Sequence, residues 1–287
     1  MKEFEGWEFA EISSVSFNKK IAFVDGGQAL LVHSPELVVG LVRVVGVVYE
    51  GLEKKEVVKW EGEVSITPVV EGDFMRYDAE VKGMGKSYSF NAEDKRLRLG
   101  VESADIGFLL GVVRKLLEWE MMVEVMDKVV GGFVVRDGDL AVRYPYEEEL
   151  FEKIRVKGEQ LGVGISGISK TSKLLDRKGR SLLHGLVERY GSWVATGEAM
   201  VVKLHPDSKY VFVFDCLGEV KEIVGILRQF SRDISVLGYP YGLFEADRLA
   251  RVGNHEKEYF RVKKRFTEGN IERLERSLDF HGVLDGI

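Results

Sequence analysis

Two aspartates follow apolar, strand-like segments in the same local pattern. Asp25 ends the apolar run of IAFVDGGQ and Asp137 ends that of FVVRDGDL, and a glycine follows each of them. Glycine leaves room for a metal ion or a phosphate to approach the backbone, although Asp-Gly is also a common turn dipeptide. If the two strands are neighbours, the carboxylates lie side by side and repel each other unless a divalent cation lies between them. The two motifs together predict a metal site.

A long helix, expected over residues 105–128, supplies a third acid. Glu120 has apolar residues three, four and seven positions away, whereas Glu118 lies beside basic residues at helical spacing. This pattern predicts that Glu120 points toward the sheet, with Glu124 as the alternative one turn later. A buried carboxylate requires a partner, which could be a shared metal ion or an ordinary Lys or Arg side chain.

The segment GYPYGLFEAD adds a fourth acid. Pro240 is expected to lead the chain from a strand into a helix, and Asp247 lies in the first turns of that helix, eight residues after Tyr239. The Tyr239 phenol could orient a phosphate or a water molecule, or it could simply pack at this corner. Four acids from two strands and two helices suit two-metal phosphodiester hydrolysis, in which one ion activates water and the other stabilises the leaving oxygen.

A basic segment follows the acidic one. Residues 102–150 contain eleven acids and five bases, whereas residues 151–190 contain nine bases and four acids. Lys170 in GISKTSKLL is expected to begin a helix, so its ammonium group and the first backbone N–H groups could bind an anion. Lys173, Arg177 and Lys178 extend this charge, although a solvated helix face is an alternative for them.

The order of elements predicts how these residues are positioned. Residues 21–91 contain strand-like runs separated by Gly and Asx residues, and helical spacing begins at residue 105. Helices are then expected over 147–161, 171–190, 219–232 and 242–266, with apolar runs between them. This order predicts an α/β fold with a mixed sheet flanked by helices and a β-rich insertion. We expect a single domain over residues 1–287, with the insertion at 51–100, which could instead be a separate small β domain.

Composition excludes several classes of protein. With 287 residues, 45% of them hydrophobic and 31% charged, the chain can form a sizeable core and is not a disordered tail. Its longest apolar run, 37–49, is too short to span a bilayer, and the N-terminus has no secretory signal, so a cytoplasmic location is expected. The only cysteine, Cys216, and five scattered histidines argue against a zinc site, and no ATP-binding P-loop motif occurs.

The ordered set FVDGG, VVRDGDL, GISKTSKLL and GYPYGLFEAD resembles the archaeal and bacterial NurA nucleases. The resemblance implies an RNase H-like core with metal ligands at Asp25, a helix glutamate, Asp137 and Asp247, and it places Tyr239 beside the metal. The distance before the RDG aspartate favours Glu120 as the helix ligand. Many relatives carry His in place of Asp247, but Asp is an equally good ligand for Mn²⁺ or Mg²⁺.

The resemblance also implies a function. We expect a metal-dependent deoxyribonuclease, a 5′–3′ exonuclease and single-strand endonuclease, that resects DNA ends for repair by homologous recombination. A HerA-type hexameric ATPase is the expected partner, and a homodimer is the expected assembly. Lys170, Lys173, Arg177 and Lys178 are expected to contact DNA. The alternatives are a non-catalytic DNA-clamping adaptor and an RNase H-like enzyme acting on RNA or a hybrid.

The terminal segments are candidates for the partner surface. Phe4, Trp7 and Phe9 place three large apolar side chains on a short stretch that cannot bury them by itself. We therefore expect them to contribute to subunit or ATPase contacts. The alternative is that they fold back onto the core of their own protomer, and the same two possibilities hold for the apolar residues of 278–287.

Overall fold

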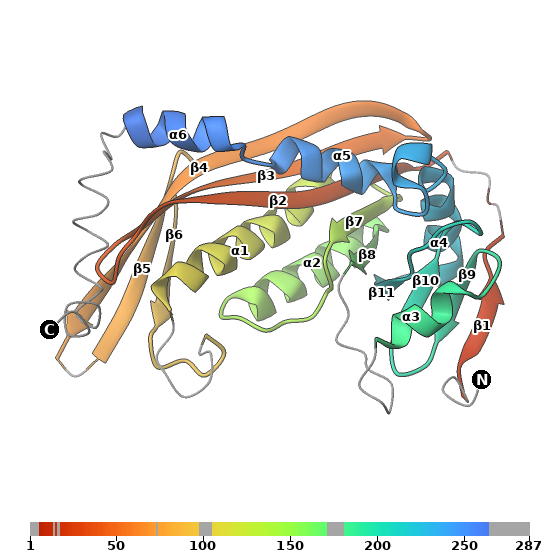
Figure 1. Cartoon of the computed structure of the whole chain (residues 1–287), viewed down its shortest axis with the longest axis horizontal. Helices are drawn as coiled ribbons and strands as arrows, with labels where there is room; N and C mark the ends of the chain where they lie inside the picture. Colours follow the sequence, from red (N-terminus) through yellow and green to blue (C-terminus); the bar gives the residue numbers. More distant parts are fainter. Residues whose placement is uncertain are drawn as a thin grey trace, which may run out of the picture.

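The fold is a large mixed β-sheet with helices packed on both of its faces. The computed structural model describes residues 6–13, 15, 18–72, 74–97, 105–170 and 181–263. In this part of the chain, eleven strands form one sheet in the order β1-β9-β10-β11-β8-β7-β2-β3-β4-β5-β6 (Figure 1). The prediction of an α/β fold with a mixed sheet and flanking helices is confirmed.

The first half of the sheet is an antiparallel meander. Its strands are β2 (Lys20–His33), β3 (Val38–Glu50), β4 (Glu53–Glu71), β5 (Phe74–Lys82) and β6 (Lys86–Asn91). Each strand pairs with the next along the chain, and the β3–β4 ladder runs from Val38↔Ile66 to Glu50↔Glu53. The strands within residues 51–100 therefore continue the main sheet.

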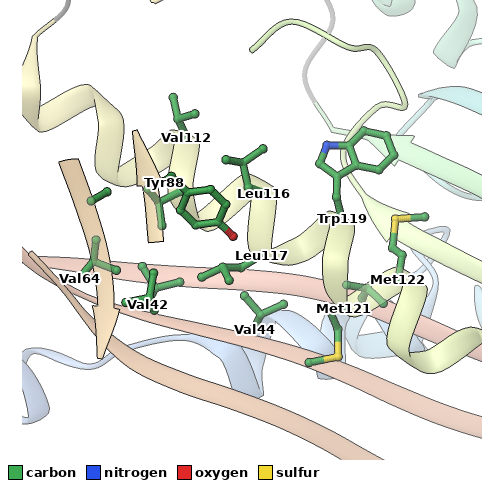
Figure 2. Close-up of a cluster of buried hydrophobic side chains, with 14 of the residues drawn as sticks. Val42, Val44, Val64, Tyr88, Val112, Leu116, Leu117, Trp119, Met121 and Met122 are labelled. Atoms are coloured by element: carbon green, nitrogen blue, oxygen red, sulfur yellow. The ribbon is translucent and has the colours of Figure 1, made fainter. Parts of the chain in front are cut away.

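The long helix lies against this curved meander. α1 (Ile106–Met126) has apolar side chains on most of its circumference. Val42, Val44, Val64 and Tyr88 of the strands pack around it as one buried cluster (Figure 2). Apolar burial on nearly every side of α1 holds it in the concave side of the sheet, which determines where its few charged side chains can point.

The centre of the sheet is parallel. β7 (Phe133–Asp137) pairs with β2, and β8 (Gly164–Ser169) pairs with β7, with α2 (Glu147–Leu161) as the crossover between them. The remaining strands follow in antiparallel order: β11 (Phe212–Leu217), β10 (Met200–Lys203), β9 (Trp193–Thr196) and β1 (Glu8–Glu11). A short helix, α3 (Leu182–Val187), precedes β9.

The opposite face of the sheet carries the last helices. They are α4 (Val220–Phe230), a single 3₁₀ turn (Ile234–Val236), α5 (Tyr241–Ala250) and α6 (Asn254–Lys263). α5 contacts β2 and β3, and α6 contacts β2. The single helix predicted over 242–266 is wrong, because the chain is non-helical at residues 251–253. The predicted strand before Pro240 is likewise the 3₁₀ turn. None of the described helices is both long and apolar enough to span a bilayer.

The Asp25-Gly26-Gly27 segment lies within a strand and does not end one. β2 continues through it to His33, paired with β3 on both sides of it. A Cβ atom on Gly26 would lie 2.6 Å from Glu118 Oε1 on one face, and one on Gly27 would lie 2.2 Å from the Ala250 carbonyl oxygen on the other. The glycines therefore let α1 and α5 approach the two faces closely, which the prediction of a strand end missed.

Trp7 and Phe9 pack against the core of their own protomer. The Phe9 ring packs edge-on against Trp193 with centroids 5.2 Å apart, and a Cβ on Gly197 would lie 2.3 Å from the Trp7 ring. Both side chains are partly buried where β1 pairs with β9, and their contribution to subunit or ATPase contacts stays a prediction. Phe4 and residues 278–287 lie outside the described residues.

The close approach at Gly27 leads to a stability prediction. Gly27→Ala should lower the free energy of unfolding by about 1–3 kcal/mol, because the new methyl group overlaps a backbone carbonyl that cannot rotate away. Gly253→Ala is the matched control: a Cβ there meets nothing within 4 Å, so a change within about 0.5 kcal/mol is expected. Urea denaturation measures both. Equal stability of the two variants would contradict the close packing of α5 on β2.

Candidate functional site

Asp25 and Asp137 are brought together by the parallel pairing of β2 and β7. Phe23 pairs with Val135 and Val24 with Arg136, so the next positions on the two strands are the two aspartates. Residues two apart share a face of the sheet, so both aspartates lie on the face where Phe23 and Val135 contact α5. The sequence-based prediction that the two acids lie side by side agrees with this register.

Two further predicted residues contact Asp137. The Tyr239 hydroxyl donates a hydrogen bond to Asp137 Oδ2 over 3.0 Å, and Lys170 Nζ lies 2.5 Å from the same oxygen. The Lys170 ammonium group also lies over the Tyr239 ring, 4.7 Å from its centroid. Tyr239 comes from the turn before α5 and Lys170 follows β8, so three separate segments meet at this carboxylate.

The site has an excess of buried negative charge. Burial, together with the neighbouring Asp137 and Glu118, raises the pKa of Asp25 to about 8, against smaller lowering by the Gly26 N–H and Lys170. Burial and the adjacent Asp137 also raise the pKa of Tyr239, so its phenol stays protonated and acts as a donor. A cation would relieve the repulsion between these carboxylates.

Of the α1 acids, Glu118 is the one whose charge acts on Asp25, whereas the predicted Glu120 faces β6. Glu118 is 1% exposed and lies beside Gly26. The Glu120 carboxylate instead accepts a hydrogen bond of 2.9 Å from Tyr88 and pairs with Lys86, both on β6. Apolar neighbours failed as a guide because α1 is buried on most of its sides. The alternative, Glu124, is exposed.

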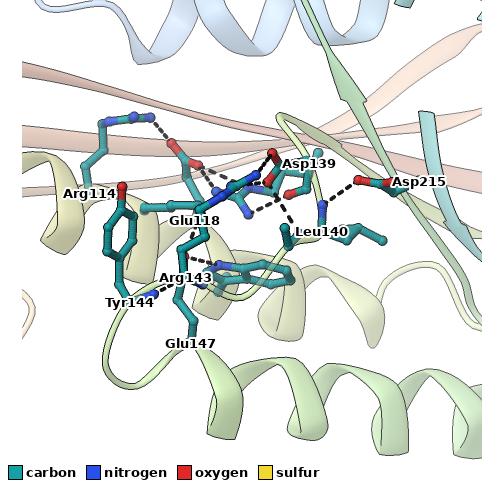
Figure 3. A network of polar contacts seen from close by, with 12 residues as sticks. Arg114, Glu118, Asp139, Leu140, Arg143, Tyr144, Glu147 and Asp215 are labelled. Atoms are coloured by element: carbon teal, nitrogen blue, oxygen red, sulfur yellow. Dashed lines mark hydrogen bonds and ion pairs between the residues drawn. The ribbon is translucent and has the colours of Figure 1, made fainter. Parts of the chain in front are cut away.

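Glu118 is fully engaged by two arginines. Arg136 Nη2 and Nε donate to its Oε2 over 2.9 and 3.2 Å, and Arg114 Nη1 donates to its Oε1 (Figure 3). Arg136 also lies over the Trp119 ring, with its central carbon 4.5 Å from the centroid. The basic residues flanking Glu118 in the sequence were the available signal for this partnership.

A second buried acid supports the loop that follows Asp137. Glu147 has no exposed surface and accepts hydrogen bonds from Trp119 Nε1 and from the backbone N–H groups of Arg143 and Tyr144 (Figure 3). Burial alone would raise the pKa of Glu147, but these donors and Lys115 outweigh it, so the pKa is lowered.

Asp215 of β11 pins the same loop from the other side. Its Oδ2 accepts the Leu140 N–H over 3.0 Å. Because Leu140 lies only three residues after Asp137, this contact restrains the loop at the point where it leaves the site. Neither Glu147 nor Asp215 was predicted from the sequence as a support of the site.

The remaining predicted site residues are less engaged or outside the description. Asp247 is partly exposed on α5, 2.6 Å from Arg251 Nη2, and close enough to Tyr239 to contribute to its raised pKa. Lys173, Arg177 and Lys178 lie outside the described residues.

Asp25 and Asp137 are the residues that fit a divalent cation. Within the described ranges, no three His, Cys, Asp or Glu side chains gather into a group that could hold a metal ion. The pair nevertheless carries the chemistry such an ion requires, since hard divalent cations bind carboxylate oxygens and water. Glu118 adds negative charge nearby, but its oxygens are occupied by arginine donors.

Comparison with known proteins adds a relationship at the level of fold. No family model and no curated protein matches this chain. The crystal structure of the NurA nuclease from Sulfolobus solfataricus is similar over 90% of this chain and 86% of that one, with a TM-score of 0.53 and 13% identity. The chain has a NurA-like fold. The catalytic domain of human Endonuclease V aligns over 87% of this chain and 85% of that one, with a TM-score of 0.41 and 12% identity.

The raised pKa of Asp25 leads to a prediction for metal-free protein. Because this pKa is about 8 in the folded chain and ordinarily 3.8, the unfolded chain releases the proton first as pH rises. The wild type should therefore lose stability between about pH 4 and pH 8, by at most about 1.4 kcal/mol per pH unit. Asp25→Asn removes this loss.

Urea denaturation in EDTA at several pH values tests this prediction. The stability of Asp25→Asn relative to wild type should increase with pH. Asp127→Asn, at an exposed aspartate paired with Lys157 over 2.6 Å, should follow the wild-type curve. If the stability of Asp25→Asn and of the wild type changes with pH in parallel, the pKa of Asp25 is not raised in the folded protein.

Proposed function

We propose that this protein is a divalent-metal-dependent nuclease whose active site is built on Asp25 and Asp137. The observation that carries the proposal is the pair formed by the buried Asp25 and the partly buried Asp137 on adjacent parallel strands, with the pKa of Asp25 raised to about 8. Repulsion between neighbouring carboxylates destabilises the folded protein, and carboxylates with strongly raised pKa values are concentrated in active sites. The NurA-like fold supports the same conclusion.

Each residue has a role that its contacts support. Asp25 and Asp137 would hold the ion, Mn²⁺ or Mg²⁺, which when bound supplies an activated water and neutralises charge on the leaving oxygen. The neutral Tyr239 phenol fixes the orientation of Asp137 through its 3.0 Å hydrogen bond. Lys170, whose side chain is 45% exposed, balances the charge of Asp137 and can turn toward a substrate phosphate.

The substrate and partners follow from the resemblance of the motifs. We propose DNA ends as the substrate, cut from 5′ to 3′ and within single strands, during resection for repair. A homodimer working with a HerA-type hexameric ATPase is the corresponding assembly. Trp7 and Phe9 are partly buried against their own protomer, so only their exposed parts could contribute to a surface for these partners.

A cleavage assay tests the catalytic proposal. Purified protein is incubated with end-labelled single- and double-stranded DNA and with RNA, in Mn²⁺, Mg²⁺ or EDTA. We expect cleavage of DNA with metal and none in EDTA. Asp25→Asn and Asp137→Asn should each reduce the rate by about 100-fold or more, since each removes a ligand of the metal. Asp127→Asn is the matched control and should retain the wild-type rate.

Four outcomes would contradict parts of this proposal. Cleavage that persists in EDTA would rule out metal dependence, and wild-type rates for both site variants would place the chemistry elsewhere. Cleavage of RNA or a hybrid in preference to DNA would leave the site in place and change the substrate. DNA binding without cleavage under any metal condition would indicate an adaptor.

A further inference from the structure

Arg114 lies at an unpaired edge of the sheet beside the carboxylate pair. β7 pairs with β2 only as far as Val24↔Arg136, and β2 then continues to His33 with no further β7 partner. Arg114 Nη1 donates over 3.0 Å to the carbonyl oxygen of Gly26, the residue that follows Asp25. The guanidinium group is thus one residue away from the proposed metal ligand, where the open edge of β2 begins.

The orientation of this guanidinium group is set by the protein. Its Nη1 is shared between Gly26 and the buried Glu118, and its Nε donates to Gln28 Oε1 over 3.2 Å. Within the described part of the chain, no hydrogen bond uses Nη2. The side chain is 30% exposed. An arginine whose Nε and Nη1 groups are already hydrogen-bonded presents its Nη2 group in a fixed orientation, so little rotamer entropy is lost when it binds a ligand.

The other cations near the pair are less available. Arg136 is 3% exposed, and its donors go to Glu118 and to the Asp139 carbonyl oxygen. Lys170 is bound to Asp137 itself. A phosphate that approaches Asp25 and Asp137 meets carboxylates of its own charge, so it needs a positive group at the rim, and Arg114 offers there an Nη2 group that is not committed to either aspartate.

We propose that Arg114 binds a backbone phosphate of single-stranded DNA at the open edge of β2, next to the Asp25 and Asp137 pair. This inference rests on the proposed nuclease function and adds to it a substrate-binding residue outside the carboxylate site. Gly26 contributes through its missing side chain, because a Cβ there would lie 3.2 Å from Arg114 Cγ and 2.6 Å from Glu118 Oε1.

Salt-dependent binding tests this assignment without any cleavage. Fluorescence anisotropy measures the affinity of the full chain for a short labelled single strand, in EDTA, at a series of KCl concentrations. Arg114→Gln should weaken binding by about 10-fold, the scale of one charge-assisted hydrogen bond. It should also reduce the magnitude of the slope of log K against log[KCl] by about 0.7, the value for one phosphate contact on a single strand.

Two further variants make the result specific. Arg155→Gln removes the same charge from an exposed arginine on α2 that pairs with Glu152 and Glu159, and its affinity and slope should match wild type. Arg114→Lys keeps the charge but loses the fork of donors, so affinity should fall by about 3-fold or more with the slope unchanged. If Arg114→Gln does not fold, the affinity of Arg114→Lys tests whether Arg114 binds the phosphate.

The outcomes separate the inference from the function beneath it. Wild-type affinity and slope in both Arg114 variants would overturn the role of Arg114, while cleavage by the wild type would still support the nuclease. Equal losses in Arg114→Gln and Arg155→Gln would reduce the effect to net charge and also overturn it. A wild-type protein that neither binds nor cuts single-stranded DNA would contradict the function and the inference together.

Discussion

The repulsion between the buried Asp25 carboxylate and the partly buried Asp137 carboxylate is the constraint on which the site depends. Asp25 and Asp137 each directly follow the last register pair of two parallel strands, Val24↔Arg136. Neither aspartate can therefore move away without disrupting the centre of the sheet. The cores on both faces hold these strands in place, and apolar burial supplies the free energy that keeps the acids together. A bound cation would remove the repulsion, which makes metal binding and fold stability parts of the same balance.

The acidic side chains around Asp25 and Asp137 have hydrogen-bond partners of their own. Glu118 is neutralised by two arginines, so it shapes the site through its field and its hydrogen bonds and is not available as a ligand. Glu147 and Asp215 hold the loop after Asp137 through backbone N–H groups. The Gly26-Gly27 pair allows α1 and α5 to press on the same strand from opposite sides. These contacts around the site stabilise the fold, while the repulsion between the carboxylates of Asp25 and Asp137 destabilises it.

Local sequence was sufficient to predict the aspartate pair, because both occur where apolar strand sequence meets glycine. Tyr239 and Lys170 were also found from their motifs, and their contacts with Asp137 place them at the site. The helix acid could not be predicted in this way. Apolar spacing identifies a facing side only when one face of a helix is buried, and α1 is covered by the sheet and by α2.

Other differences arise from tertiary packing. An Asp-Gly-Gly sequence signals a turn, but here it continues a strand because β3 pairs with it throughout and two helices require the missing side chains. The break between α5 and α6 is held by a long-range contact, in which Arg43 on β3 donates to the Arg251 carbonyl oxygen over 2.8 Å and pairs with Glu256. Such contacts join residues about two hundred positions apart and leave no periodic trace in the sequence.

Binding of Mn²⁺ to metal-stripped protein, measured by titration calorimetry, tests most directly whether Asp25 and Asp137 form a cation site. The wild type should bind Mn²⁺ saturably, and this binding should be lost in Asp25→Asn and in Asp137→Asn. Glu120→Gln should bind as the wild type does, because Glu120 is held by β6 away from the pair. Undiminished binding in both aspartate variants, or its loss in Glu120→Gln, would contradict the account.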